Sequence, residues 1–547
     1  MKFVSEPEIS VKIDRMKRRV RWQEKSIKDR KIDQTKLVVD DGKRNNPDFS
    51  FLVIGDSGCG SHLKHHPQRQ IAEMMLEHSS DCSFVLHTGD VVYQVGSSEY
   101  YHDNFIEPYK EFLVGGENPN KLSYDRLTFK LPFFLVPGNH DYYDLPLIYG
   151  ILVQATWLPR RLLRGQIDLD VGWHGSDEGD AYARAFLDYL ANIKGKINLA
   201  RHLDANYTGN HTGDRCLNYQ PGKFTRLPNR YYTFRYGGID FLALDSNTFN
   251  QPLSIPDTEA GEIKRAKLIT SQQELNKQEQ QIREAIDQLN SDNPDDADRL
   301  DDYYAKLEHI AETQRDIDKQ LSKTEQITDW EQLIWLKSSL VASWQDETVK
   351  GRIIFLHHPP YVTESTKWNQ GQTLAIRDRL RQVFNDVVKE IGTLPPGRSV
   401  VDIVISGHAH CMEHLYTKDT GYADSYINWI VCGGSGHSLR RQRTEGTILF
   451  QDGDENSQPI GHPFPVLKRR GLRATVGQSQ LFLGRNGRGK HKKRPYSFLR
   501  IDVRGGDKPQ FTIRPHVAEW YQHQWNKYAI KPFLIKEIMH CITNESD

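Results

Sequence analysis

The chain has 547 residues, 37% of them hydrophobic, and its 72 basic and 72 acidic side chains give a formal net charge of zero. It is long enough to bury a sizeable core and to hold more than one structural unit. The balanced charge argues against whole-molecule attraction to nucleic acid or membrane. Six scattered cysteines without CxxC pairs indicate neither a disulfide framework nor a zinc framework.

Residues 1–47 are charged and poorly patterned, and we interpret them as a partly helical or disordered N-terminal arm. Charges stand where a signal peptide would need an apolar region, and no later stretch approaches the run of about 20 apolar residues that spans a membrane. We therefore expect a cytoplasmic protein without a membrane partner.

An α/β pattern begins at residue 48. Three apolar, β-like runs end in polar residues: FLVIGDSG at Asp56, FVLHTGDVVY at Asp90 and Tyr93, and FFLVPGNHD at Asn139 and His140. Helical runs such as PQRQIAEMMLEHSS and SEYYHDNFIEPYKEFL alternate with them, which is the βαβ rhythm of a layered α/β domain. Strands deliver their last residues to the sheet edge, where loops carry sites on a rigid scaffold.

A block at 147–229, rich in Arg, Gly, Asp and aromatic residues, interrupts the pattern directly after the third run. It could form a lid or substrate wall, or it could pack away from the site as decoration. The next segment, YYTFRYGGIDFLALDS, predicts a β-hairpin, because Gly237 and Gly238 can take the positive φ values of a tight turn.

Residues 259–326 depart from the α/β pattern and have a purely helical one. Apolar residues recur at heptad-like spacing on both sides of SDNPDDAD, which predicts two helices forming an antiparallel coiled-coil hairpin inserted into the domain. Such an arm could self-associate or dock a protein partner, or it could be satisfied internally and project into solvent. Because it looks self-contained, we expect that replacing it with a short linker leaves the activity of the rest of the domain largely intact.

Two further apolar runs end in histidines: IIFLHHPPY at His357 and IVISGHAH at His408 and His410. NWIVCGGSGH follows, and then a basic segment at 438–494 that contains RRQR, KRRG and GRNGRGKHKKR. Clustered Lys and Arg can track a nucleic-acid backbone, but base-stacking aromatics are nearly absent between these charges. A solvated loop, or one attracting polyanionic substrates, is the more economical interpretation. Strands near 496–514 could close the fold before a tail at 515–547.

The five polar run ends supply the ligands of a two-metal phosphoesterase. Two cations about 3.5–4 Å apart can hold a phosphate ester, generate hydroxide and neutralise the developing charge. Carboxylates suit such cations, and neutral imidazoles accommodate Fe, Zn or Mn. His140 could donate a proton to a leaving alkoxide near neutral pH, or it could only orient Asp56 or Asp90.

At these motifs the chain resembles the calcineurin-like metallophosphoesterases, and among them the purple, tartrate-resistant-type acid phosphatases. The histidine of the common D-x-H motif is missing at Asp56-Ser57-Gly58, and Tyr93 stands three residues after Asp90, as in the purple branch. The resemblance implies one metal held by Asp56, Asp90, Tyr93 and His410. It implies a second held by Asp90, Asn139, His357 and His408, with His357 preferred to His358 from the H-x-P-x-Y register.

The resemblance also implies a four-layer α/β/β/α sandwich over residues 48–514. It implies Fe(III) with Fe, Zn or Mn as the second metal, and a metal-bound hydroxide that attacks a phosphate ester while His140 acts as the acid. We therefore expect a phosphomonoesterase-like hydrolase. The alternatives are a phosphodiesterase or nuclease using the same site, and a non-enzymatic coiled-coil or nucleic-acid-binding scaffold.

Overall fold

The computed structural model describes most of the chain, namely residues 4–58, 65–144, 175–211, 213–290, 293–322, 326–395, 398–451, 474–488 and 491–535. Parts of the expected 147–229 block and of the 438–494 basic segment therefore lie outside the described residues.

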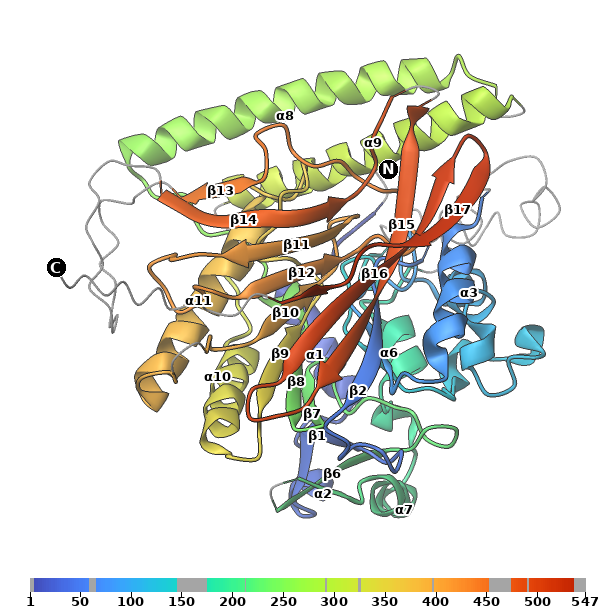
Figure 1. Ribbon diagram of the computed structural model, residues 1–547, viewed down its shortest axis with the longest axis vertical. Helices are drawn as coiled ribbons and strands as arrows, with labels where there is room; N and C mark the ends of the chain where they lie inside the picture. Colours follow the sequence, from blue (N-terminus) through green and yellow to red (C-terminus); the bar gives the residue numbers. More distant parts are fainter. Residues whose placement is uncertain are drawn as a thin grey trace.

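Two β-sheets form the centre of the molecule (Figure 1). The strands are β1 Ile32–Val39, β2 Phe49–Ile54, β3 Val85–His87, β4 Phe133–Leu135, β5 Gly209–His211, β6 Asp214–Tyr219, β7 Tyr232–Tyr236, β8 Ile239–Ala243, β9 Gly351–Phe355, β10 Ile403–Ser406, β11 Met412–Thr417, β12 Asn428–Cys432, β13 Ile448–Gln451, β14 Ala474–Leu483, β15 Lys493–Arg504, β16 Gln510–Tyr521, β17 Gln524–Ala529 and β18 Phe533–Leu534. Within the described chain, eleven strands form the larger sheet in the order β13-β14-β11-β12-β10-β9-β8-β7-β1-β6-β5. The smaller sheet runs β17-β16-β15-β2-β3-β4, with β18 beside β16.

Aromatic side chains fill the space between the sheets. Phe51 of the smaller sheet meets Phe241 of the larger one edge to face, with ring centroids 5.5 Å apart. Phe134 and Phe234 lie 4.1 Å apart across the same interface. Large aromatic rings bury much apolar area each, so this layer fixes how the two sheets face one another.

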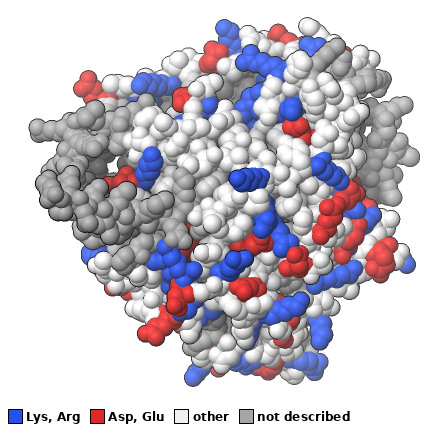
Figure 2. Space-filling view, in the orientation of Figure 1, with Lys and Arg blue, Asp and Glu red and all other residues white. Residues whose placement is uncertain are grey.

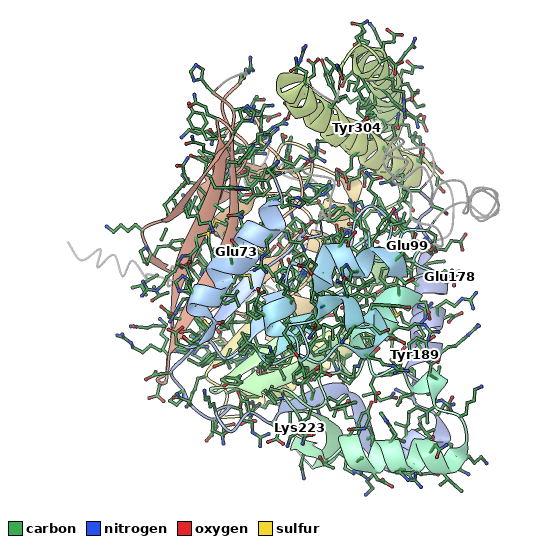
Figure 3. The ribbon with its side chains drawn as sticks, turned by 90° about the vertical axis from the view of Figure 1, so that its right-hand side faces the viewer. Glu73, Glu99, Glu178, Tyr189, Lys223 and Tyr304 are labelled. Carbon is green, nitrogen blue, oxygen red and sulfur yellow. The ribbon has the colours of Figure 1, made fainter. Side chains whose placement is uncertain are left out.

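The described part of the chain also forms α-helices. They are α1 Ile9–Arg19, α2 Lys25–Lys28, α3 Pro67–Ser79, α6 Asp180–Phe186, α7 Lys196–Asn206, α8 Glu259–Ile286, α9 Pro294–Leu321, α10 Trp330–Gln345 and α11 Gly371–Ile391. Helix α3, marked by Glu73 in Figure 3, packs on the smaller sheet, where the rings of His78 and His516 lie 4.2 Å apart. Leu336 of α10 and Leu380 of α11 share an apolar cluster with Val404 of the larger sheet. The mixed α/β expectation is confirmed, and the four-layer order stays a prediction.

The carboxyl ends of parallel strands position the polar residues picked out by sequence. In the smaller sheet β2, β3 and β4 pair in parallel, and the loops after them carry Asp56, Asp90 and Asn139. In the larger sheet β8, β9 and β10 pair in parallel, and the chain after β9 and β10 carries His357 and His408. The loops at the carboxyl ends of strands from both sheets thus carry the expected metal ligands.

Several local predictions can be compared with the structure. The hairpin β7–β8 is confirmed, with φ of 57° at Gly237 and 78° at Gly238. Helix α3 is also confirmed. The run from Ser98 to Leu113 was expected to be helical. It forms only short helical pieces, at Ser98–Tyr100, His102–Ile106 and Lys110–Phe112, with a break around Pro108, a residue that lacks a backbone donor.

The ends of the expected domain differ from the sequence interpretation. Residues 9–39, within the expected N-terminal arm, form α1, α2 and β1, and β1 pairs in parallel with both β6 and β7. Residues 515–535, within the expected tail, continue the smaller sheet through β16, β17 and β18. In each segment the charged residues alternate with apolar ones that reach the core, such as Leu37 and Val517.

Helices α8 and α9 form an antiparallel pair across one end of the sheets (Figures 1 and 3, where Tyr304 marks α9). Gln272 of α8 donates to Asp318 of α9 at 2.6 Å, and Gln314 of α9 donates to Asn276 of α8 at 2.8 Å. Helix α9 also packs against the rest of the molecule, with Leu307 and Ile310 buried. This contradicts the expectation of a self-contained hairpin projecting into solvent, while coiled-coil geometry stays a prediction.

One face of the molecule shows mixed charge. On the face in Figure 2, basic and acidic side chains of the described residues are interspersed. None of the helices described is both long enough and apolar enough to cross a membrane.

Candidate metal centre

Three of the expected ligands occupy strained backbone positions. Asp56, Asp90 and His408 have φ values of 50°, 55° and 64°. Residues with a Cβ rarely adopt this left-handed region, and such strain concentrates at functional sites, where surrounding structure holds it in place. Each of these residues lies in the short loop after a buried strand, where the chain must turn to bring its side chain over the sheet edge.

Tyr93 lies at the middle of the first group of polar atoms. Its hydroxyl oxygen lies 3.0 Å from Asp56 Oδ1, 2.8 Å from Asp90 Oδ2 and 3.2 Å from His410 Nε2, all within hydrogen-bonding distance. His410 Nε2 is in turn 3.5 Å from Asp56 Oδ1. The four side chains expected to hold one metal therefore converge.

A second group lies on the other side of Asp90. His357 Nε2 is 2.8 Å from Asn139 Oδ1 and 3.4 Å from Asp90 Oδ2. Ligand atoms of Asp56, Asp90 and His357 all lie within 4.8 Å of one another. Asp90 is the residue shared by both groups, as two neighbouring cations would require of a bridging carboxylate.

Backbone carbonyls fix the orientation of two histidines. His357 Nδ1 lies 2.8 Å from the Thr88 carbonyl, and His410 Nδ1 lies 2.9 Å from the Ser438 carbonyl. A carbonyl only accepts, so each Nδ1 carries a proton and Nε2 is the ring nitrogen that faces the centre. This is the usual arrangement of metal-binding imidazoles.

His408 and His358 stand at the edge of the second group. Ligand atoms of His357, His358 and His408 lie within 4.8 Å of one another. The Gln372 amide donates to His408 Nε2 at 3.0 Å, and the His408 backbone N–H donates to Asp56 Oδ2 at 2.8 Å. His358 is engaged elsewhere, with Ser246 Oγ 2.8 Å from its Nδ1. These contacts favour His357 over His358 as a ligand beside Asp90.

The protonation of the centre reflects its burial. None of the seven expected ligands, nor His140, is more than 4% exposed. Burial raises the pKa of Asp56 to about 8, to which the charge of Asp90 adds. Burial acts to lower the pKa of His357, but the facing carboxylate of Asp90 outweighs it and raises the pKa to about 9. Burial also raises the pKa of the Tyr93 phenol well above its usual range, and both aspartates reinforce this effect.

These protons occupy positions that cations could take. Carboxylate, phenolate and neutral imidazole bind metals only after losing their protons, so metal binding here would release them. The donor set of carboxylates, a phenol, an amide oxygen and imidazoles fits Fe, Zn or Mn.

His140 lies beside both groups. Its backbone N–H donates to Asp90 Oδ1 at 2.9 Å, and its Nδ1 lies 2.6 Å from the Gln94 carbonyl, to which it donates. Its Nε2 is 3.8 Å from a carboxylate oxygen of Glu308 and 3.8 Å from one of Glu312. Burial acts to lower its pKa, but Asp90 and the two glutamates outweigh burial and raise the pKa.

Several residues of the centre were missed by sequence reasoning. Asp141 accepts backbone hydrogen bonds from Asp90 and Gly138 at 3.0 and 2.8 Å and so holds two loops together. The His437 ring stacks on Tyr93 with centroids 3.9 Å apart. Both occur in motifs noted above, GNHD and GGSGH, so their positions were visible. Glu308 and Glu312 carried no such signal, because they look like solvent-facing residues of a charged helix.

Known proteins resemble this chain only weakly. No family model matches the sequence, and no curated protein matches it. A purple acid phosphatase isolated from yellow lupin (Lupinus luteus) seeds is 11% identical with a TM-score of 0.39, covering 90% of this chain and 54% of that one. GAP50, the anchor in the inner membrane complex of Plasmodium, is 13% identical with a TM-score of 0.33, covering 88% and 89%. This chain thus spans about half of the lupin protein, and similarities this weak carry no argument about function.

Proposed function

We propose that this chain is a metal-dependent phosphoric ester hydrolase of the purple acid phosphatase type. The observation that carries the proposal is the convergence of two ligand groups on Asp90. Tyr93 and His410 approach it from one side, and Asn139 and His357 approach it from the other. A packed core has no need for so many buried donors and acceptors around one carboxylate, because burying polar groups is costly.

The residues would divide the work as follows. Asp56, Tyr93 and His410 would hold one cation, Asn139, His357 and His408 would hold the other, and Asp90 would contact both. When bound, such cations hold a phosphate ester, neutralise developing charge and acidify water. Thr88 and Ser438 keep the imidazoles in the ligating tautomer through their carbonyls. Asp141 keeps the loop of Asp90 against that of Gly138.

His140 would protonate the leaving alkoxide. Its Nδ1 proton is committed to the Gln94 carbonyl, so Nε2 is the atom that can give up a proton to substrate. The raised pKa keeps more of the imidazole protonated near neutral pH than in free histidine. We propose phosphate monoesters as the substrate class, iron(III) as the cation beside Tyr93, and Fe, Zn or Mn as its neighbour.

Metal content and hydrolysis test the proposal together. Purified protein reconstituted with Fe, Zn or Mn should bind close to two metals per chain and hydrolyse an aryl phosphate, and a chelator should abolish turnover. Asp90→Asn should reduce turnover at least about a hundredfold, because a neutral amide bridges two cations poorly. Asp103→Asn provides the control, since it makes the same change on a side chain that is 66% exposed.

The outcomes separate the alternatives. Preference for aryl phosphate diesters over monoesters would indicate a phosphodiesterase or nuclease using the same residues. A protein that takes up no metal after reconstitution, and hydrolyses neither ester, would be the non-enzymatic scaffold instead.

A further inference from the structure

Helix α9 presents a row of acidic residues to the interior. Glu308, Glu312 and Asp316 follow one another at four-residue spacing and therefore share one face of the helix. Each is at least 94% buried, although a helix on the surface of a protein normally turns such residues to solvent. The face that carries them lies over the candidate metal centre.

Glu308 and Glu312 accept hydrogen bonds from the donors that surround the centre. Glu308 lies 3.0 Å from His437 Nε2 and accepts from Arg440 Nη2 at 3.2 Å. Glu312 accepts from Lys367 Nζ at 2.6 Å. His140 Nε2 stands 3.8 Å from each of them, and it has no closer hydrogen-bond partner within the described residues.

These donors are the kind that would bind a phosphate. Lys, Arg and protonated His make their strongest hydrogen bonds to carboxylate and phosphate oxygens, which are interchangeable as acceptors. An ester bound at the two cations would direct its remaining oxygens to the same donors and meet the charges of Glu308 and Glu312. Like charges at such distances repel strongly in a buried site.

We propose that α9 is an autoinhibitory lid, whose Glu308 and Glu312 stand in for the anionic group of the substrate. The α8–α9 pair has to shift before a phosphate ester reaches the centre. This inference rests on the proposed function for the identity of the ester, while the occupied donors belong to the chain itself.

Ion pairs at the two ends of α9 hold the lid. Near its start, Asp302 lies 2.7 Å from Arg485 and 2.6 Å from Lys492, two residues of the basic segment. Near its end, Lys319 donates to Glu6 at 2.7 Å. Partly exposed ion pairs contribute little individually. These contacts at the two ends of α9 can therefore break at little cost, and the buried contacts of Glu308 and Glu312 remain to hold the middle of the helix.

Binding of inorganic phosphate tests the lid directly. The double variant Glu308→Gln/Glu312→Gln keeps the shape of both side chains but removes their charge. By calorimetry, both metal-loaded and metal-free, it should bind phosphate at least about tenfold more tightly than wild type, since two repelling charges are gone. Asp318→Asn, on the exposed side of the same helix, should leave the affinity unchanged.

A second variant releases the helix without touching the centre. Asp302→Asn combined with Lys319→Gln should speed amide hydrogen exchange along α9 and raise the affinity for inorganic phosphate, as well as kcat/KM on an aryl phosphate, with metal content unchanged. This variant keeps the inference testable even if the double glutamine variant fails to fold.

The results distinguish the lid from the proposed function. Phosphate affinity that stays equal or falls in a folded double glutamine variant would overturn the lid. So would faster exchange in the anchor variant without any gain in phosphate affinity. Tighter phosphate binding in variants that hydrolyse no ester would support the lid and refute the hydrolase.

Discussion

The environment of Tyr93 suits a phenol that gives up its proton to bind a cation. Its hydroxyl is fully buried among two aspartates and a histidine, and that surrounding raises the pKa of the phenol. A phenol in such a place stays protonated unless a strongly charged cation takes the proton's position. The residue is therefore a sensitive reporter of what binds there.

Iron-loaded, oxidised protein should be coloured, because a phenolate bound to Fe(III) gives a visible charge-transfer band. Tyr93→Phe should abolish the band while the ring keeps its stacking on His437. Absorption spectra of the two proteins at equal iron content provide the measurement. Colour that survives the substitution would remove Tyr93 from the ligand set.

At this scale the sequence was a good guide wherever a polar residue follows an apolar run. Asp56, Asp90, Asn139 and His357 each sit directly beyond a strand, so their convergence follows from parallel strand pairing. Lys367 and Arg440 could not be placed in the same way. Each lies in a connecting segment, and its partner comes from a helix remote in sequence.

Among the elements, α9 was wrongly predicted to turn its charged faces to solvent. The periodicity of apolar residues identifies the apolar face of a helix, but it does not show what covers the other faces. Leu307, Ile310 and Ile317 follow the heptad pattern and are buried, as expected. Glu308 and Glu312 are buried too, on a face that the pattern assigned to solvent. Replacing 259–326 with a linker would remove the acidic partners of Lys367 and Arg440 together with the helix that covers these two residues. Turnover is therefore not expected to survive that replacement unchanged.

An ion pair between a histidine and an aspartate attaches helix α7 to the chain that precedes it. His202 Nε2 lies 2.9 Å from both oxygens of Asp188, which also accepts from Tyr207 at 2.9 Å. Burial acts to lower the pKa of His202, but the hydrogen-bonded carboxylate outweighs it and raises the pKa above 6.5. The protonated histidine therefore fastens α7 to the chain that precedes it.

A histidine whose pKa rises on folding stabilises the fold fully below its ordinary pKa and loses that effect as pH rises through the raised value. His202→Gln should therefore cost about 0.5–1 kcal/mol of unfolding free energy at a pH below the ordinary histidine pKa, a modest value because the pair is partly exposed, and progressively less as the pH rises above it. Urea unfolding at several pH values measures this, with His102→Gln at a more exposed histidine as control. A cost that does not change with pH would exclude the ion pair.

For the whole molecule, the centre unites residues from Asp56 to His410 and both sheets. Strand β15, late in the chain, pairs with β2 near its beginning and with β16 on its other side, so the smaller sheet closes only when distant segments meet. Binding of cations at the meeting point of the sheets should stabilise all of them at once.

Metal should accordingly raise the melting temperature of the entire protein. A ligand at a hundredfold excess over its Kd adds about 2.7 kcal/mol to the free energy of unfolding. Calorimetric scans with and without chelator should differ by several degrees for wild type, and Asp56→Asn should remove most of the difference. Coincident scans would mean that no cation binds the native centre.

Strand β1 is synthesised long before the two strands with which it pairs. Ile32 pairs with Arg215 and Lys36 pairs with Thr233, so both neighbours of this strand leave the ribosome long after it does. Until then Leu37 and Val39, fully buried in the finished protein, have no sheet to enter. A nascent chain of this protein must therefore carry an apolar, unpaired strand near its beginning through much of translation, which makes this segment a natural binding site for a ribosome-associated chaperone.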